Sequence, residues 1–200
     1  MTEPEEGLVT AVAGVGAIPD ESIRPNTSLD QLAKLKPSFR ADGTITAGNA
    51  SPLSDGAAAV LLGSETVAET VGRAPIARIA AKTAVALDPR DFGYAPVVAA
   101  NKALVAAGIE WDQVGAVELN EAFAVQSLAC IQAWPVDPAI VNQWGGALAI
   151  GHPLGASGAR ILGTLAAVLR HTKERWGVAC ICIGVGQGLA IVLQNTEMSA

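Results

Sequence analysis

Short apolar runs alternate with segments of helical spacing along most of the chain. The runs have the length of buried strands and lie at residues 57–62, 76–83, 116–119, 176–183 and 189–193. Helices are expected within residues 28–39, 97–107, 121–132 and 159–170, and another is expected to begin at Ser64. Strands that alternate with helices in this way predict an α/β fold built in layers.

Two of the apolar runs have similar surroundings. Asp55-Gly56 precedes the run at 57–62, and Gln187-Gly188 precedes the run at 189–193. Each run looks like the last strand of an α/β unit. The second unit is complete in this chain, whereas the first is represented by its tail, so its other strands are expected outside this sequence.

Composition favours a folded, acidic protein. The chain has 200 residues, of which 50% are hydrophobic and 16% are charged, which is enough for a sizeable core. A net charge of −6 argues against broad binding of nucleic acid. An anion can still bind at a local basic cluster, and Arg24, Lys34, Lys36 and Arg40 form one.

The sequence also excludes several classes of protein. It contains no run of eighteen apolar residues, so we expect no membrane span. Residues 1–7 are acidic, unlike a signal peptide, and we expect a cytoplasmic protein. Three cysteines and two histidines predict neither a disulfide framework nor a metal site.

Asn120 directly follows the buried run at 116–119 and precedes a predicted helix. Ligands of α/β sheets gather at the carboxyl ends of the strands, so its side chain is well placed to act on a substrate. The alternative is a helix N-cap, a position that asparagine also favours. The local pattern leaves the two interpretations about equal.

His152 lies in a Gly-rich segment, with Gly151 before it and Gly155 and Gly158 after it. Glycines allow a substrate to approach, and the helix expected from Ala159 points its positive N-terminus at this loop. Such an imidazole can act as a base or as a hydrogen-bond donor to an oxyanion. His171, by contrast, is interpreted as a solvated residue at the end of that helix.

Cys182 lies at the end of a predicted strand, next to a Gly-rich turn at residues 184–188. A thiol at this junction can face a cleft, although a buried apolar cysteine is the commoner case. Cys180 and Cys130 fit the buried interpretation better. The turn is not a dinucleotide-binding loop, because a strand and not a helix follows it.

Together these signals resemble the thiolase family. The matching motifs are Asn120-Glu121-Ala122-Phe123, Gly145-Gly146 with Gly151-His152-Pro153 and Gly155-Ala156-Ser157-Gly158, and Cys182-Ile183-Gly184 with Gly186-Gln187-Gly188. A fourth, Ala47-Gly48-Asn49-Ala50-Ser51 followed by Asp55-Gly56, resembles the place where the family's coenzyme A loop returns to the sheet. The similarity runs from about Asp20 to Leu193.

The resemblance implies a layered α/β/α fold. Residues 1–73 would be the end of the coenzyme A loop region with the last strand and helix of the N-terminal half. Residues 74–200 would be the complete C-terminal half-domain. An oligomer is implied as well, either of this chain with itself or with a partner chain that supplies the N-terminal half.

The resemblance also implies roles in an acyl-CoA C-acyltransferase of fatty acid metabolism. His152 would activate a nucleophilic cysteine, Asn120 would hold a water in the first oxyanion hole, and Cys182 would move the proton at the α-carbon. The Gly184 amide would contribute to the second oxyanion hole. Ser51, Ala50 and Arg24 would contact coenzyme A, and Phe123 and Phe92 would line the acyl pocket. Acyl-CoA and coenzyme A would be substrates, with no tightly bound cofactor.

The sequence departs from the family in one important respect, since the nucleophilic cysteine belongs to the family's N-terminal half. Neither Cys130 nor Cys180 has a matching context, and Gln143-Trp144 and Val185 differ from the family pattern. One hypothesis is therefore a thiolase component that is completed by another segment. The alternative is a non-catalytic coenzyme A-binding or scaffold subunit, which would not need Asn120, His152 and Cys182.

Overall fold

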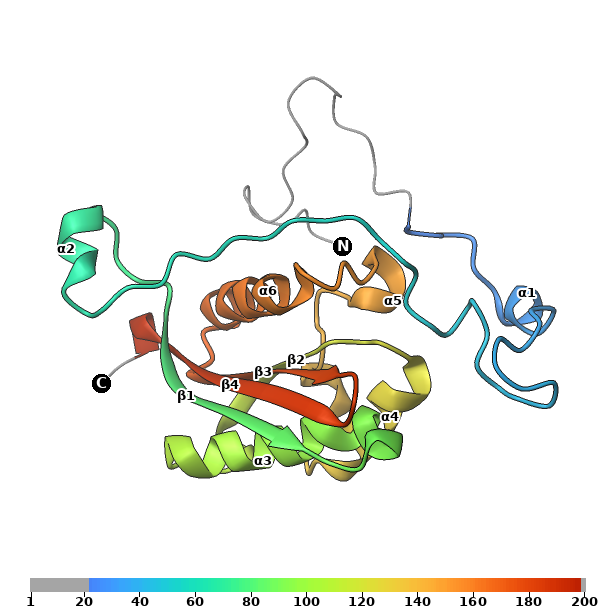
Figure 1. Ribbon diagram of the computed structural model, residues 1–200. Helices are drawn as coiled ribbons and strands as arrows, with labels where there is room; N and C mark the ends of the chain where they lie inside the picture. Colours follow the sequence, from blue (N-terminus) through green and yellow to red (C-terminus); the bar gives the residue numbers. More distant parts are fainter. Residues whose placement is uncertain (1–21, 199–200) are drawn as a thin grey trace, which may run out of the picture.

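The computed structural model describes residues 22–198, and in it a mixed sheet is covered by helices on both faces (Figure 1). The strands are β1 (Ala77–Ala86), β2 (Val114–Leu119), β3 (Trp176–Ile183) and β4 (Gln187–Asn195). The α-helices are α1 (Leu29–Leu32), α2 (Val67–Val71), α3 (Ala95–Ala107), α4 (Ala124–Ala133), α5 (Ala147–Ile150) and α6 (Ser157–Thr172). Short 3₁₀ helices lie at Pro89–Tyr94, Trp111–Gln113, Pro138–Ile140 and Thr196–Met198.

The sheet has the order β1-β4-β3-β2. β4 pairs antiparallel with both β1 and β3, while β2 runs parallel to β3. A parallel pair needs a crossover, and the chain from β2 to β3 makes it through α4, α5 and α6. The carboxyl ends of β2 and β3 therefore meet at one edge of the sheet.

Two apolar clusters fill the space between the sheet and its helices. On one face, Val117 and Leu119 of β2 pack with Val178 and Cys180 of β3 in a cluster that includes α3. On the other face, Ala116 and Ala179 pack with buried residues of α6. Because both faces of these strands are covered, they read as continuous apolar runs in the sequence. The predicted α/β/α layering is confirmed.

Most predicted elements are found with small shifts at their ends. Gly108 ends α3 with a φ of 70°, as its position after the helix suggested. Ser28 caps α1 through its hydroxyl, but the helix ends at Leu32 and not at residue 39, since it has no buried residues to hold further turns. The strand expected at 76–83 is longer, because β1 continues to Ala86 alongside β4.

The strand predicted at residues 57–62 is wrong. Residues 52–64, named here the strap, lie as an irregular segment that crosses over α6 (Figure 1). Their apolar pattern resembles that of β4, but β4 has a strand on each side and the strap has none in the described chain. Without a partner strand, the backbone donors and acceptors of the strap remain in contact with solvent.

No helix among residues 22–198 combines the length and hydropathy that a membrane span requires. Residues 1–7, whose acidic character entered the sequence analysis, lie outside the described part of the chain.

Candidate active site

Asn120 lies at the carboxyl end of β2 and is completely buried. Its backbone N–H donates to the carbonyl of Cys180, which continues the β2–β3 ladder by one residue. The helix that follows begins at Ala124 with Phe123 as its N-cap, so Asn120 does not cap it. The interpretation of Asn120 as a helix cap is therefore wrong, and its amide is free for other partners.

The Asn120 side chain meets the imidazole of His152, with Nδ2 3.1 Å from Nε2. These residues are 32 positions apart in the sequence, and the turn between β2 and α4 brings the amide to the loop in front of α6. The other atom of the amide, Oδ1, is buried and has no hydrogen-bond partner in the described chain. A buried acceptor of this kind is costly to leave empty, so it marks a place for a donor.

Ser157, the first residue of α6, fixes the tautomer of His152. The hydroxyl of Ser157 donates to the carbonyl of Pro153 at 3.1 Å, and its oxygen lies 2.6 Å from Nδ1 of His152. Because a hydroxyl has a single proton, Nδ1–H of His152 must be the donor in the second contact. Nε2 is then unprotonated, and its lone pair accepts the hydrogen bond from Asn120.

The environment of His152 keeps the imidazole unprotonated. Burial lowers its pKa, and the nearby Arg160 guanidinium lowers it further. A neutral imidazole with an unprotonated Nε2 is the form that accepts a proton from a nucleophile. The sequence-based expectation of a base at His152 therefore agrees with the geometry around it.

The loop that carries His152 is anchored by two residues whose roles the sequence analysis missed. Asn142 exchanges hydrogen bonds with the backbone of Leu119 and also donates to Glu121 Oε1. Glu121 Oε2 accepts from the backbone N–H of Leu148 at 3.0 Å. A side chain on Gly146 would collide with the Glu121 carboxylate. These contacts hold the loop against the end of β2.

Cys182 lies near the end of β3, two residues beyond the carbonyl that binds Asn120. Its side chain is 7% exposed, and burial raises the pKa of its thiol. At neutral pH the thiol therefore holds its proton. Gly184 lies after it in the exposed hairpin between β3 and β4, with open space on the side where a Cβ would be.

The other two thiols are less suited to chemistry. Burial raises the pKa of Cys180 strongly, and raises that of Cys130 to about 11. Both side chains lie in the cluster beneath α3. Cys130 also donates through Sγ to the carbonyl of Gly93. The interpretation of both residues as buried, apolar cysteines is confirmed.

Two of the three residues proposed to contact coenzyme A, Ser51 and Ala50, contact the segment that follows Asn120. Ser51 donates to the carbonyl of Ala122 through both its N–H and its hydroxyl, and Ala50 forms a bridge with Phe123. Arg24 lies in an exposed turn, and no hydrogen bond or ion pair joins it to Asn120 or His152 within residues 22–198.

The two aromatic residues proposed for the acyl pocket lie on different segments. Phe123 packs edge-on against Phe39, with 6.1 Å between the ring centroids. Phe92 is half-buried in the 3₁₀ helix Pro89–Tyr94. Phe123 is therefore next to the segment around Ala50, whereas Phe92 belongs to the connection between β1 and α3, which contacts α4.

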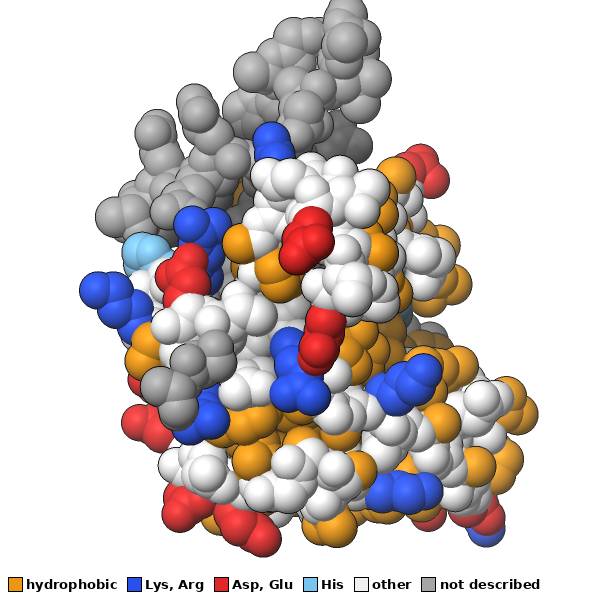
Figure 2. All heavy atoms as spheres, turned by 90° about the vertical axis from the view of Figure 1, so that its left-hand side faces the viewer, with side chains coloured by type: hydrophobic (Ala, Val, Ile, Leu, Met, Phe, Trp, Pro, Cys, Tyr) orange, Lys and Arg blue, Asp and Glu red, His pale blue; other side chains and the backbone are white. Residues whose placement is uncertain are grey.

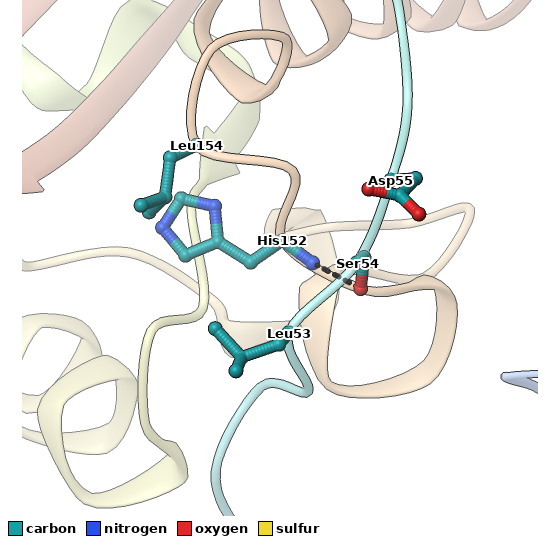
Figure 3. A pocket seen from close by; sticks show the side chains of 5 residues that line it. All are labelled: Leu53, Ser54, Asp55, His152 and Leu154. Carbon is teal, nitrogen blue, oxygen red and sulfur yellow. Dashed lines mark hydrogen bonds between the residues drawn. The ribbon is translucent and has the colours of Figure 1, made fainter.

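A hollow of about 430 Å³ opens beside the imidazole and is lined by Leu53, Ser54, Asp55, His152 and Leu154. Figure 3 shows Leu53 and Leu154 on either side of the imidazole, while Asp55 points away from it. Ser54 accepts a hydrogen bond from the backbone N–H of His152 at 3.2 Å (Figure 3). The strap thus forms one wall of the hollow.

Glu118 is a further residue that sequence analysis passed over, because it stands within the apolar run at 116–119. It is 4% exposed, and burial raises its pKa to about 8, with the Glu121 charge adding to the effect. A charged residue inside a strand that is covered on both faces was the signal that could have found it. Within residues 22–198, no group of three or more His, Cys, Asp or Glu side chains is arranged to hold a metal ion.

Comparison with known proteins places these motifs in a family. The family described as "Thiolase, C-terminal domain" matches residues 73–195, and "Thiolase, N-terminal domain" matches residues 15–66. An acetyl-CoA acetyltransferase of Shinella zoogloeoides is 49% identical over 176 residues, which are 88% of this chain and 45% of that protein. A 3-ketoacyl-CoA thiolase of Yersinia pestis (strain Pestoides F) is 49% identical over 180 residues, 88% of this chain and 46% of that protein.

A solved structure agrees with these sequences. Human mitochondrial 3-ketoacyl-CoA thiolase in complex with CoA superposes with a TM-score of 0.81 at 40% identity, over 88% of this chain and 45% of that chain. The chain spans about half the length of the relatives that it matches. Sequence motifs, fold and family match agree, and the chain belongs to the thiolase family.

Proposed function

We propose that this chain supplies the histidine, the asparagine and the proton-transferring cysteine of a thiolase active site. An N-terminal half, from a partner chain or from a longer polypeptide, would contribute the nucleophilic cysteine. The completed enzyme would catalyse the reversible cleavage of 3-ketoacyl-CoA by coenzyme A. The observation that carries this proposal is the Asn120–His152 contact, in which Nε2 presents a lone pair at the end of the sheet.

In the cleavage direction, Nε2 of His152 takes the proton of the incoming nucleophilic thiol. The thiolate attacks the 3-keto carbon, and the bond between C2 and C3 breaks. C2 then carries the electron pair and takes a proton from the Cys182 thiol, which yields acetyl-CoA. Coenzyme A finally gives its thiol proton to the Cys182 thiolate and attacks the acyl thioester on the nucleophile. The shortened acyl-CoA is released, and the departing nucleophile thiolate takes back its proton from His152.

Negative charge develops on a thioester or ketone oxygen in both halves of this reaction, so donors are needed there. The unpartnered Oδ1 of Asn120 supports a role in holding a water next to His152. The N–H of Gly184, a residue in the exposed hairpin, would serve the second oxyanion hole. Burial of Cys182 keeps its thiol protonated, as the proton donor in this scheme requires.

For coenzyme A we propose contacts with Ser51, Ala50 and Arg24, and for the acyl chain a pocket that includes Phe123 and Phe92. The CoA complex of the human relative supports coenzyme A as a substrate for a protein of this family. Nucleic acid is not proposed as a partner, and Figure 2 shows acidic and basic side chains interspersed on the face seen there. The cytoplasmic location stays a prediction of the sequence.

The test is complementation. The chain is produced together with the N-terminal half of a thiolase, and the thiolysis of acetoacetyl-CoA is followed. We expect turnover with the wild-type chain and a loss of roughly 10²-fold or more for His152→Ala, because a positioned base typically contributes that much. His171→Ala is the matched control, since His171 is exposed at the far end of α6 and should have no effect. A scaffold subunit would give the same rate with both variants.

We also predict that the chain associates, with itself or with the half that completes it. The predicted unpaired strand at 57–62 does not exist, but the strap exposes apolar side chains, including Leu53 (98%), Leu61 (79%) and Leu62 (65%). Such a contiguous segment marks an interaction surface. Sedimentation should show dimers or larger species for the wild-type chain, or a complex with the N-terminal half.

The control for this prediction uses lysine substitutions. Leu61→Lys with Leu62→Lys should weaken the association. Leu29→Lys, which changes an exposed leucine outside the strap, should leave it intact. A wild-type chain that stays monomeric and binds no N-terminal half would contradict the prediction.

A further inference from the structure

Arg160, one turn into α6, holds the histidine loop by its backbone. Its Nη1 donates to the carbonyl of Gly151 at 2.9 Å, and Gly151 is the residue immediately before His152. Gly151 has a φ of 86°, a conformation that side chains rarely adopt, and a Cβ there would collide with Ser54. The guanidinium therefore secures the loop at the point from which the imidazole extends.

A cation at this position is not favoured by its own helix. The N-terminus of α6 carries the positive end of the helix dipole, and the first turn contains no acidic residue. Arg160 is also half-buried, so part of its hydration is lost.

Glu118 of β2 lies on the side of the sheet that α6 covers. Side chains alternate between the two faces of a strand, and Ala116 packs on the α6 side while Val117 and Leu119 pack on the α3 side. Glu118 therefore faces α6, the layer from which Arg160 comes. The Arg160 charge lowers the pKa of Glu118, opposing the larger effect of burial, as expected for two groups close together.

Three titratable or charged groups influence the Glu118 carboxyl or feel its charge, and one of them, the Cys180 thiol, lies on the opposite face of the sheet. Glu121, in the turn after β2, raises its pKa, and Arg160 lowers it. From β3, the buried Cys180 thiol is close enough for the Glu118 charge to raise its pKa. With a pKa of about 8, Glu118 is mostly protonated at pH 7 and ionises a little above it.

We propose that Arg160 is a positioning residue for His152, and that Glu118 beneath α6 controls how strongly the guanidinium charge acts on the imidazole. Arg160 fixes the Gly151 carbonyl and disfavours a second proton on the ring, so the Nδ1–H form with an unprotonated Nε2 persists. An ionised Glu118 offsets part of this charge, and a protonated Glu118 leaves it at full strength. The importance of Arg160 and Glu118 for catalysis rests on the proposed function.

Histidine-labelled NMR of the 200-residue chain tests the first part, because the sequence contains two histidines and both can be assigned. In Arg160→Gln the titration midpoint of His152 should move to higher pH, since a neighbouring positive charge is gone. The His171 signals, from the other end of α6, serve as the internal reference. A folded Arg160→Gln chain with a wild-type midpoint for His152 would overturn the proposal.

Arg170→Gln is the matched control. Arg170 lies near the end of the same helix, where it pairs with Glu197 at 3.0 Å, so its loss should leave the His152 titration unchanged. A shift of equal size in this variant would assign the effect to net charge rather than to Arg160, and would count against the proposal.

The second part needs no arginine variant. In the wild-type chain, the His152 signals should show a second inflection near pH 8, where Glu118 ionises, and Glu118→Gln should remove it. A wild-type titration without this step, or a step that survives in Glu118→Gln, would overturn the role of Glu118. Because these readouts require no turnover, an inactive completed enzyme would refute the proposed function and leave them unaffected.

Discussion

Replacing Cys182 by serine in the completed enzyme should separate the two halves of the reaction. Formation of the acyl-enzyme depends on His152 and the nucleophile, so acetylation by acetyl-CoA should remain near the wild-type rate. Condensation and thiolysis should fall by roughly 10²–10⁴-fold, the usual contribution of a positioned acid–base group. A serine hydroxyl is smaller than a thiol and fits the same buried site at the end of β3, but it is far less acidic than a thiol and does not ionise near neutral pH.

Two measurements follow the halves of this reaction separately. Mass spectrometry reports the acetylated nucleophile, and exchange of the acetyl-CoA methyl protons in D₂O reports proton transfer at the α-carbon. Cys130→Ser is the control, because a hydroxyl can keep the hydrogen bond to the Gly93 carbonyl, and full activity is expected. Wild-type proton exchange in Cys182→Ser would remove Cys182 from the mechanism.

The second large effect concerns the 200-residue chain by itself, which should form no stable acetyl adduct with acetyl-CoA. A nucleophilic thiol must be ionised and accessible. Cys130 has a pKa of about 11, so about one molecule in ten thousand carries its thiolate at pH 7. Cys180 is 1% exposed, and burial also keeps Cys182 protonated. Thiolysis of acetoacetyl-CoA should be absent for the same reason.

Intact-mass measurement after incubation with acetyl-CoA decides this point, with the complemented enzyme as the positive control. An acetyl group on Cys180 or Cys182 that free coenzyme A removes would show that the chain contains a complete catalytic pair. The need for an N-terminal half would then be refuted.

The sequence predicted the centre of the candidate site because each residue there carries a local signal. Asn120 is a polar residue directly after a buried strand, and His152 is surrounded by glycines before an amphipathic helix. Parallel strands bring their carboxyl ends together, so the pattern implied a common edge for Asn120 and Cys182. The direct contact between Asn120 and His152 required the structure, because the path of a Gly-rich loop is not encoded by periodicity.

The predictions that were wrong or incomplete also have physical causes. Residues 57–62 have the apolar pattern of a strand. A strand also needs hydrogen bonds to a neighbouring strand, and no strand lies beside these residues in the described chain. Glu118 was hidden by the apolar residues around it, and its burial depends on the helix α6, which follows about forty residues later. Ser157 was noted only as a member of the Gly-rich motif after His152, and its hydrogen bond to His152 was not foreseen.

The strap has a further consequence for the lifetime of the protein. Proteases bind their substrates as extended segments with free backbone groups, and the strap is an irregular segment of this kind (Figure 1). Its apolar side chains Leu53, Leu61 and Leu62 are exposed. Cleavage there needs no global unfolding, so the stability of the core gives this segment no protection. A surface that covers the strap therefore also shields the chain from degradation, and abundance in the cell follows the supply of whatever covers it.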